Sequence, residues 1–438
     1  MLTGDALPEL RTRVPGPRSR ALAGRLAAVE SPNITRVSPD APIFWSAARG
    51  ANVLDADGNL FIDLTAGFGV AFAGHANPGV VRALADQAEV LAHALGDVHP
   101  ADIKVRLLER LAVLAPGDLG VAILATTGAE AVEAALKTAV LATGRAGILA
   151  FDGAYHGLTY GALATTSRSE FRAPFERQLF RGVRFAPYGD RDAATALAEA
   201  ERLLDEAERD GPPIGTVIVE PVQGRAGIRV PGPGFLAGLR RLCDGRERVL
   251  IFDEVYTGFG RTGRWFACEH AGIVPDVIVV GKALSGALPI SAAIASGALM
   301  RAWPPSKGEA IHTSTFLGNP IACAAALAHL DTIEAEALVE RAARLGAVVR
   351  ARLDDWVARY PHARSARGLG LLQGLVLDDG TETPAADVAD AALGQGIIVL
   401  AEAPDLDVLA ITPPAAITER QLGHALDTIE RIIAARHA

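Results

Sequence analysis

Lysine is scarce among the basic residues of this sequence. Only four of its 42 basic residues are lysines, and the others are arginines. Lys104 and Lys137 lie in amphipathic patterns typical of helices, and Lys307 lies in the loop pattern Pro-Pro-Ser-Lys-Gly-Glu. Lys282 alone follows an apolar run typical of a buried strand. A reaction that needs a lysine nucleophile therefore has one strong candidate in this chain.

Cysteine is also scarce, and long apolar runs are missing. The three cysteines show no C-x-x-C spacing and are odd in number, which is typical of reduced packing residues rather than a disulfide framework. No apolar run reaches the length of a membrane span, and the first 20 residues contain no signal-peptide core. A net charge of -9 argues against nucleic acid as a partner. We therefore expect a cytoplasmic protein with no membrane or nucleic-acid partner and no metal site.

The arrangement of apolar segments predicts an α/β fold. With 438 residues, half of them hydrophobic, the chain can bury a large core and is expected to form two domains. From Pro78 to about residue 390, helical stretches alternate with short apolar strands, which predicts βαβ units and a mostly parallel sheet. We expect an N-terminal arm and part of a small domain in residues 1–75, a large domain in 76–320 and the rest of the small domain in 321–438. Further expected elements are a helix over 19–30, a hairpin over 53–64, a long helix over 320–356 and a strand over 371–377.

The segment 249–290 contains the residues around which the predicted chemistry is organised. Its first buried-strand pattern, 249–252, ends in Asp253, and its second, 277–280, ends in Gly281-Lys282. Ligands of open α/β sheets bind beyond the carboxyl ends of the strands, so a carboxylate and an amine are expected at the same rim. A lysine beside apolar strand ends has a lowered pKa and can attack an aldehyde. A buried aspartate can hold a pyridinium nitrogen protonated. We predict pyridoxal 5'-phosphate (PLP) as cofactor, with Lys282 as Schiff-base lysine and Asp253 as pyridinium partner.

Three other motifs follow predicted strands. Thr127, Gly128 and Ala129 precede a helix, and free N–H groups at a helix N-terminus bind phosphate, although the motif on its own is more typical of an ordinary capped helix. Tyr155 could stack on a flat cofactor ring, and the adjacent His156 has either an acid–base or a structural role. Finally, Glu220 ends another buried strand and either lines a pocket or ties loops together.

The segment 258–263, Gly-Phe-Gly-Arg-Thr-Gly, is literally G-x-G-x-x-G and raises a second class of function, a nicotinamide-dependent oxidoreductase. The dinucleotide fingerprint opens a helix directly, whereas this segment is followed by a stretch with no clean helix start. We regard this alternative as remote.

Together, these motifs resemble the class III (4-aminobutyrate and ornithine type) aminotransferases. The resemblance extends over roughly residues 52–417 and rests on the ordered series TTGAEAVEAALK, FDGAYHG, VIVEPVQG, DEVYTGFGRTG, GKALSGALPISA and TFLGNPIACAAAL. It implies the PLP fold type I, a homodimer with active sites at the interface, and the roles given above for Lys282 and Asp253. It further implies a cofactor ring between Tyr155 and Val255. The implied cofactor-binding set is Thr127, Gly128, Ala129, Tyr155, His156, Glu220, Asp253, Val255, Tyr256, Lys282 and, from the neighbouring subunit, Thr315.

Departures from the family pattern bear on the substrate. The 4-aminobutyrate and acetylornithine enzymes usually carry arginines where this chain has Leu158 and, in our best alignment, Ala410, and a glutamate where it has Arg225. Paired N–H groups of arginine are the most direct means of recognising a carboxylate, so these changes argue against glutamate and 2-oxoglutarate. Candidate substrate-binding residues are Phe68, Arg225 and Arg367.

We therefore predict a PLP-dependent aminotransferase that acts on an amine or amino acid and a 2-oxo acid. The alternative within the same family is an amino-acid racemase or epimerase, or a phospho-lyase, because these reactions need no 2-oxo acid acceptor.

Overall fold

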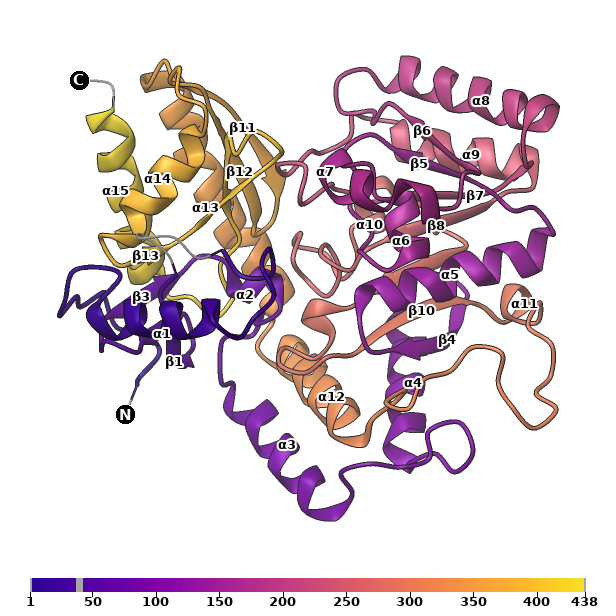
Figure 1. The fold of residues 1–438 in the computed structure, drawn as a ribbon, viewed down its shortest axis with the longest axis horizontal. Helices are drawn as coiled ribbons and strands as arrows, with labels where there is room; N and C mark the ends of the chain where they lie inside the picture. The colour runs from indigo at the N-terminus through magenta and orange to yellow at the C-terminus, as the bar shows by residue number, and fades with distance from the viewer. Residues whose placement is uncertain (1, 37–41, 437–438) are drawn as a thin grey trace.

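The computed structural model describes residues 2–36 and 42–436 and has two lobes (Figure 1). One lobe contains both the N-terminal segment, coloured indigo, and the C-terminal helices, coloured yellow; the other contains the largest sheet. No helix of the described ranges is long and apolar enough to cross a bilayer.

The largest sheet has seven strands in the order β4-β10-β9-β8-β7-β5-β6. All neighbouring pairs are parallel except those made by β10, which runs antiparallel to both β9 and β4. The prediction of a mostly parallel sheet in an α/β fold is therefore confirmed. The strands are β4 (Leu119–Ala125), β5 (Gly147–Phe151), β6 (Val183–Ala186), β7 (Ile214–Val219), β8 (Val249–Asp253), β9 (Val277–Val280) and β10 (Ser291–Ser296).

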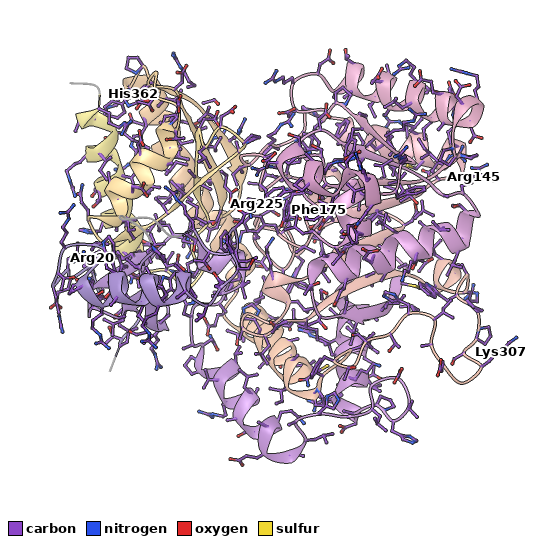
Figure 2. The ribbon with its side chains drawn as sticks, viewed as in Figure 1. Arg20, Arg145, Phe175, Arg225, Lys307 and His362 are labelled. Atoms are coloured by element: carbon purple, nitrogen blue, oxygen red, sulfur yellow. The ribbon has the colours of Figure 1, made fainter. Side chains whose placement is uncertain are left out.

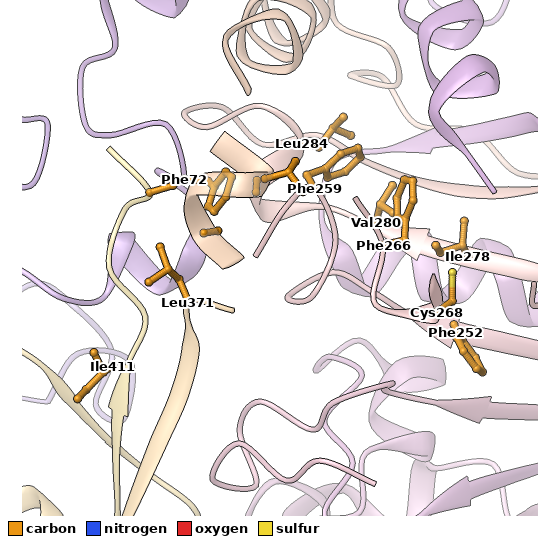
Figure 3. Packing of buried hydrophobic residues seen from close by; sticks show 14 of the residues in the cluster. Phe72, Phe252, Phe259, Phe266, Cys268, Ile278, Val280, Leu284, Leu371 and Ile411 are labelled. Atoms are coloured by element: carbon orange, nitrogen blue, oxygen red, sulfur yellow. The ribbon is translucent and has the colours of Figure 1, made fainter. Parts of the chain in front are cut away.

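Helices cover both faces of this sheet, and for that reason its central strands, β7, β8 and β9, are buried at every position. In β5, Ile148 and Ala150 pack in one cluster with α5, whereas Leu149 and Phe151 pack in another with α8 and α9. Figure 3 shows this second cluster continuing from Phe252 towards the other lobe. The surrounding helices are α3 (Pro78–Val90), α4 (Asp102–Leu114), α5 (Gly128–Thr143), α6 (Tyr160–Thr165), α7 (Ser169–Arg172), η1 (Ala173–Gln178), α8 (Ala193–Asp210), α9 (Phe235–Arg246), α10 (Cys268–Ala271), η2 (Lys282–Leu284), α11 (Gly297–Met300) and α12 (Pro320–Ala335).

Two four-stranded sheets form the other lobe. The predicted hairpin is confirmed as β2 (Asn52–Asp55) and β3 (Leu60–Asp63), and β13 (Ile397–Ile398) pairs in parallel with β3, which joins distant parts of the chain. The predicted strand at 371–377 is confirmed as β12 (Leu372–Leu377). The remaining elements are α1 (Pro17–Ala27), β1 (Trp45–Arg49), α2 (Ala66–Gly69), α13 (Leu338–Arg359), β11 (Ala363–Leu369), α14 (Pro384–Leu393), β14 (Leu400–Glu402), β15 (Val408–Ile411) and α15 (Glu419–Ala435).

The prediction of one long helix over 320–356 is wrong. The segment forms α12 and α13, separated by Glu336 and by Ala337, which has a left-handed φ of 49°. The two helices pack differently: α12 is buried along most of its length, whereas α13 buries only one face. No glycine or proline marks the break, so propensity alone gave no signal for it.

Candidate functional site

A cavity of about 690 Å³ opens at the carboxyl ends of β7, β8 and β9. The strand register explains which side chains meet there. Val219 pairs with Phe252, which brings the next residues, Glu220 and Asp253, to the same level, and Asp253 in turn pairs with Val279, shortly before Lys282. The cavity is lined by Val70, Thr126, Thr127, Gly128, Ala129, Tyr155, His156, Gly157, Leu158, Thr159, Glu220, Arg225, Asp253, Val255, Tyr256, Lys282, Ala287, Leu288, Pro289 and Ile290.

Lys282 reaches this cavity from the short turn η2 that follows β9. Its backbone has a left-handed φ of 42°, which is costly for a residue with a side chain. Burial lowers the pKa of the Lys282 amine, while the negative charges of Asp253 and Glu220 oppose that shift. Its Nζ lies 4.2 Å from the centroid of the Tyr256 ring. The site thus contains a poorly solvated amine, as the sequence predicted.

Asp253 has both carboxylate oxygens held in place. Oδ2 lies 2.7 Å from Nδ1 of His156, and Oδ1 accepts a hydrogen bond from the N–H of Val255 at 3.1 Å. His156 is itself buried, and its Nε2 atom has no hydrogen-bond partner. The structure therefore places His156 where it orients Asp253.

The N-terminus of α5 lies at the cavity wall. The side chain of Thr127 accepts from the N–H of Glu130, and Glu130 Oε2 accepts from the N–H groups of Thr126 and Thr127, which forms a capping box. The N–H groups of Gly128 and Ala129 belong to the first helical turn, where the helix provides no internal acceptor. The helix is therefore capped, and its N-terminus faces the cavity. The phosphate site at this position stays a prediction.

A second carboxylate, Glu220, ties two loops together at the rim. Oε1 accepts from the N–H of Tyr155 at 2.9 Å, and Oε2 accepts from the N–H of Gly224 at 3.1 Å. Burial raises the pKa of Glu220 to about 7, although nearby His156 works in the opposite direction. Glu220 thus lines the pocket and holds its walls.

Arg225 lies between the two lobes (Figure 2) and is the only arginine in the described lining of the cavity. Its Nε is 3.4 Å from Oε2 of Glu402, and its guanidinium carbon is 5.1 Å from the centroid of the Tyr155 ring. Burial raises the pKa of Glu402, while Arg225 and Lys282 act against that rise. Sequence reasoning missed Glu402, because it belongs to a three-residue strand with no recognisable pattern.

Three predicted residues do not line the cavity. Phe68 lies in α2, where Ala66, Gly67 and Phe68 are all left-handed, and it is 52% exposed. Thr315 is exposed in the loop before α12. Arg367 lies on β11, and its Nε donates to the carbonyl oxygen of Gly227 at 2.7 Å.

The region around Ala410 is apolar. Ala410 is 3% exposed and packs with Val222, Ile228 and Leu372, and Tyr256 packs against this cluster from the cavity side. Tyr256 thus lies both against this cluster and at the wall of the cavity, whereas Ala410 is not among the residues that line it.

The glycine-rich segment 258–263 does not open a helix. The next helix, α10, begins only at Cys268 and has four residues. Arg261 within the segment is fully buried, and its Nη1 donates to the carbonyl oxygens of Leu371 and Pro413, at 3.1 and 2.7 Å. The segment thus connects the two lobes and lacks the geometry of a dinucleotide fingerprint.

Comparisons with known proteins agree with the geometry. A family model described as Aminotransferase class-III matches residues 34–433. The acetylornithine aminotransferase of Methanosarcina mazei is 37% identical over 390 residues, 89% of this chain and 91% of that protein. The 4-aminobutyrate aminotransferase of Mycobacterium leprae is 36% identical over 442 residues, 97% of this chain and 98% of that protein. The crystal structure of the ornithine aminotransferase from Toxoplasma gondii ME49 aligns with a TM-score of 0.85 at 30% identity and covers 95% of each chain.

Proposed function

The chain belongs to the class III aminotransferase family of PLP-dependent enzymes, and we propose how its residues carry out transfer of an amino group from an amine or amino acid to a 2-oxo acid. The observation that supports this proposal best is the convergence of Lys282, Asp253 and the N-terminus of α5 on one cavity.

The cavity residues fit PLP. The N–H groups at the start of α5 offer a phosphate site. At Gly128 an added Cβ would lie 3.0 Å from Cγ1 of Val255. A side chain at this position would therefore crowd the space between the start of α5 and Val255. Asp253, with both oxygens held in place, offers a carboxyl group for a pyridinium nitrogen. We propose that Tyr155 and Val255 cover the two faces of the cofactor ring.

When bound, PLP supplies an aldehyde that links to amines and a ring that withdraws electrons from the substrate's Cα. Asp253 would hold the ring nitrogen of PLP, and Lys282 would be the amine that links to its aldehyde. The side chain of Lys282, once freed by the substrate amine, would act as the base that moves the Cα proton to the former aldehyde carbon. His156 orients Asp253, and Glu220 holds the loops that carry Tyr155 and Arg225.

We propose that Arg225 binds the carboxylate of the 2-oxo acid. Glu402 pairs with Arg225 in the absence of substrate. This ion pair must break when the carboxylate of a substrate binds to Arg225. Leu158 and the apolar surroundings of Ala410 offer no further cation, so a 2-oxo acid with one carboxylate suits the cavity better than 2-oxoglutarate.

We propose further that the chain forms a cytoplasmic homodimer in which Thr315 of one protomer completes the phosphate site of the other. The exposure of Thr315, outside the cavity of its own chain, supports this arrangement.

We also propose that residues 76–320 form the large domain and that residues 1–75 and 321–438 together form the small domain.

The test is a half-reaction. Purified protein loaded with PLP is mixed with candidate amines in the absence of any 2-oxo acid, and the visible band of bound PLP is followed. We expect bleaching to the amino form of the cofactor, and return of the band on addition of pyruvate but more slowly with 2-oxoglutarate. Racemised amino acid or released phosphate without bleaching would favour the racemase or lyase instead.

A pair of variants tests the role of Arg225. Arg225→Met should raise KM for pyruvate. It should leave unchanged the half-reaction of a donor amine that has no carboxylate group. Glu402→Gln, the matched control, keeps Arg225 and removes its competitor, so KM for pyruvate should fall. An unchanged KM in Arg225→Met would contradict the assignment.

A further inference from the structure

Tyr256 occupies an unusual position beside Lys282. The resemblance places it among the cofactor-binding residues, and its hydroxyl donates to Oγ1 of Thr412 at 3.3 Å. Its ring face, rather than its hydroxyl, is turned to the lysine, with Nζ 4.2 Å from the ring centroid. At this distance the electron-rich face of an aromatic ring attracts an ammonium group.

The position of the ring is fixed on both sides by glycines. A Cβ added to Gly69 would lie 2.4 Å from Cε2 of Tyr256, and one added to Gly224 would lie 2.4 Å from Cδ1. Side chains at either position would displace the ring. This packing and the hydrogen bond to Thr412 together hold the ring in the orientation in which its face is turned towards Lys282.

We propose that Tyr256 is a positioning residue for Lys282: its ring face holds the ammonium form of the freed lysine beside the reacting carbon. This inference deepens the proposed function and rests on it for the role of Lys282. During amino transfer the freed lysine must alternate between neutral amine and ammonium, while burial favours the neutral form. The ring face offsets that preference without adding a charge to the cavity.

Other groups around Lys282 also bear on its pKa. The carboxylates of Asp253, Glu220 and Glu402 raise its pKa, whereas Arg225 lowers it. The test must therefore change the ring and leave these four groups in place. Tyr256→Met replaces the ring by a flexible apolar chain, and Tyr256→Phe keeps the ring face and removes only the hydroxyl.

The measurement is competitive labelling with acetic anhydride across a pH series, read by peptide mass spectrometry. The protein is loaded with pyridoxamine phosphate, so that Lys282 is free, and the other three lysines serve as internal references. We expect Tyr256→Met to lower the pKa of Lys282 by roughly one pH unit, as a cation–π contact of ordinary strength predicts. Tyr256→Phe should retain the wild-type value, and the acid limb of the kcat–pH profile should move with the pKa in each variant.

Two results would overturn the proposal: an unchanged Lys282 pKa in Tyr256→Met, or equal shifts in Tyr256→Met and Tyr256→Phe, which would assign the effect to the hydroxyl. If Tyr256→Met does not fold, Gly69→Ala keeps the tyrosine and pushes its ring aside without touching Glu220 or Arg225, and it should also lower the Lys282 pKa. Failure of the proposed function is visible separately, because a protein that does not use PLP would show no cofactor band before labelling begins.

Discussion

Replacing Ala410 by arginine asks whether a carboxylate clamp can be restored at the position where related enzymes carry one. The structure predicts that it cannot. Ala410 is 3% exposed, and Val222, Ile228 and Leu372 surround it. An arginine there would have to bury a guanidinium group among apolar side chains, because Ala410 is paired on both sides within a sheet and does not line the cavity.

The magnitude follows from two costs. Overpacking a full core typically costs ~1–3 kcal/mol, and an uncompensated buried charge costs several kcal/mol more. We expect Ala410→Arg to lower the free energy of unfolding in urea by at least ~3 kcal/mol. The control Ala410→Leu, which adds volume without charge, should show only the first cost. Neither variant should gain activity with 2-oxoglutarate relative to pyruvate. A stable Ala410→Arg protein with a tenfold gain on 2-oxoglutarate would refute the reasoning, because the arginine would then have reached the cavity.

Further predictions concern the anion site, the substrate pair and pH. Gly128→Val should weaken PLP binding at least tenfold in equilibrium titration, because its side chain would collide with Val255, whereas Gly24→Ala, with open space at its Cβ, should bind normally. Glu402→Gln should lower KM for pyruvate about fivefold, the effect of a partly exposed ion pair worth ~1 kcal/mol; a higher KM would show that Glu402 helps to bind the acceptor. Glu254, the residue after Asp253, is fully buried, and burial raises its pKa from 4.5 to about 7. Protonation of this carboxyl group therefore stabilises the folded state. The resulting stability is complete below pH 4.5 and is lost as pH rises through 7, by roughly 3 kcal/mol at most. Glu254→Gln should flatten this decline in urea unfolding between pH 4.5 and 8, and an equally steep decline in the variant would count against it.

The rim of the sheet could be predicted because it depends on local patterns and one general rule. Apolar runs ending in Asp253 and Lys282 indicate buried strands, and parallel strands bring their carboxyl ends to one edge. The cavity does contain both residues, together with Tyr155 and Glu220 from two further motifs. Local patterns were sufficient to predict these residues, since each one stands at or shortly after the end of a strand that the sequence pattern predicts.

The outer part of the site depends on long-range packing. Glu402 meets Arg225 across 177 positions of the chain, through a strand too short to recognise. The orientation of Tyr256 depends on Gly69, Gly224 and Thr412, which come from three separate segments. Likewise, β10 consists of alanine and serine apart from Ile294, a composition with weak strand propensity, and it is held in the sheet by pairing with β9 and β4. Such features are set by tertiary contacts that no local pattern encodes.

The central claim is that Lys282 is the residue that binds PLP. Borohydride makes the bond between PLP and a lysine permanent, and the four lysines of this chain fall in well-separated positions, so peptide mass spectrometry can assign the label unambiguously. We expect the PLP-derived mass on Lys282 alone, and none on Lys282→Ala protein treated in the same way. A label on Lys104, Lys137 or Lys307 in the wild-type protein, with Lys282 unmodified, would contradict the account.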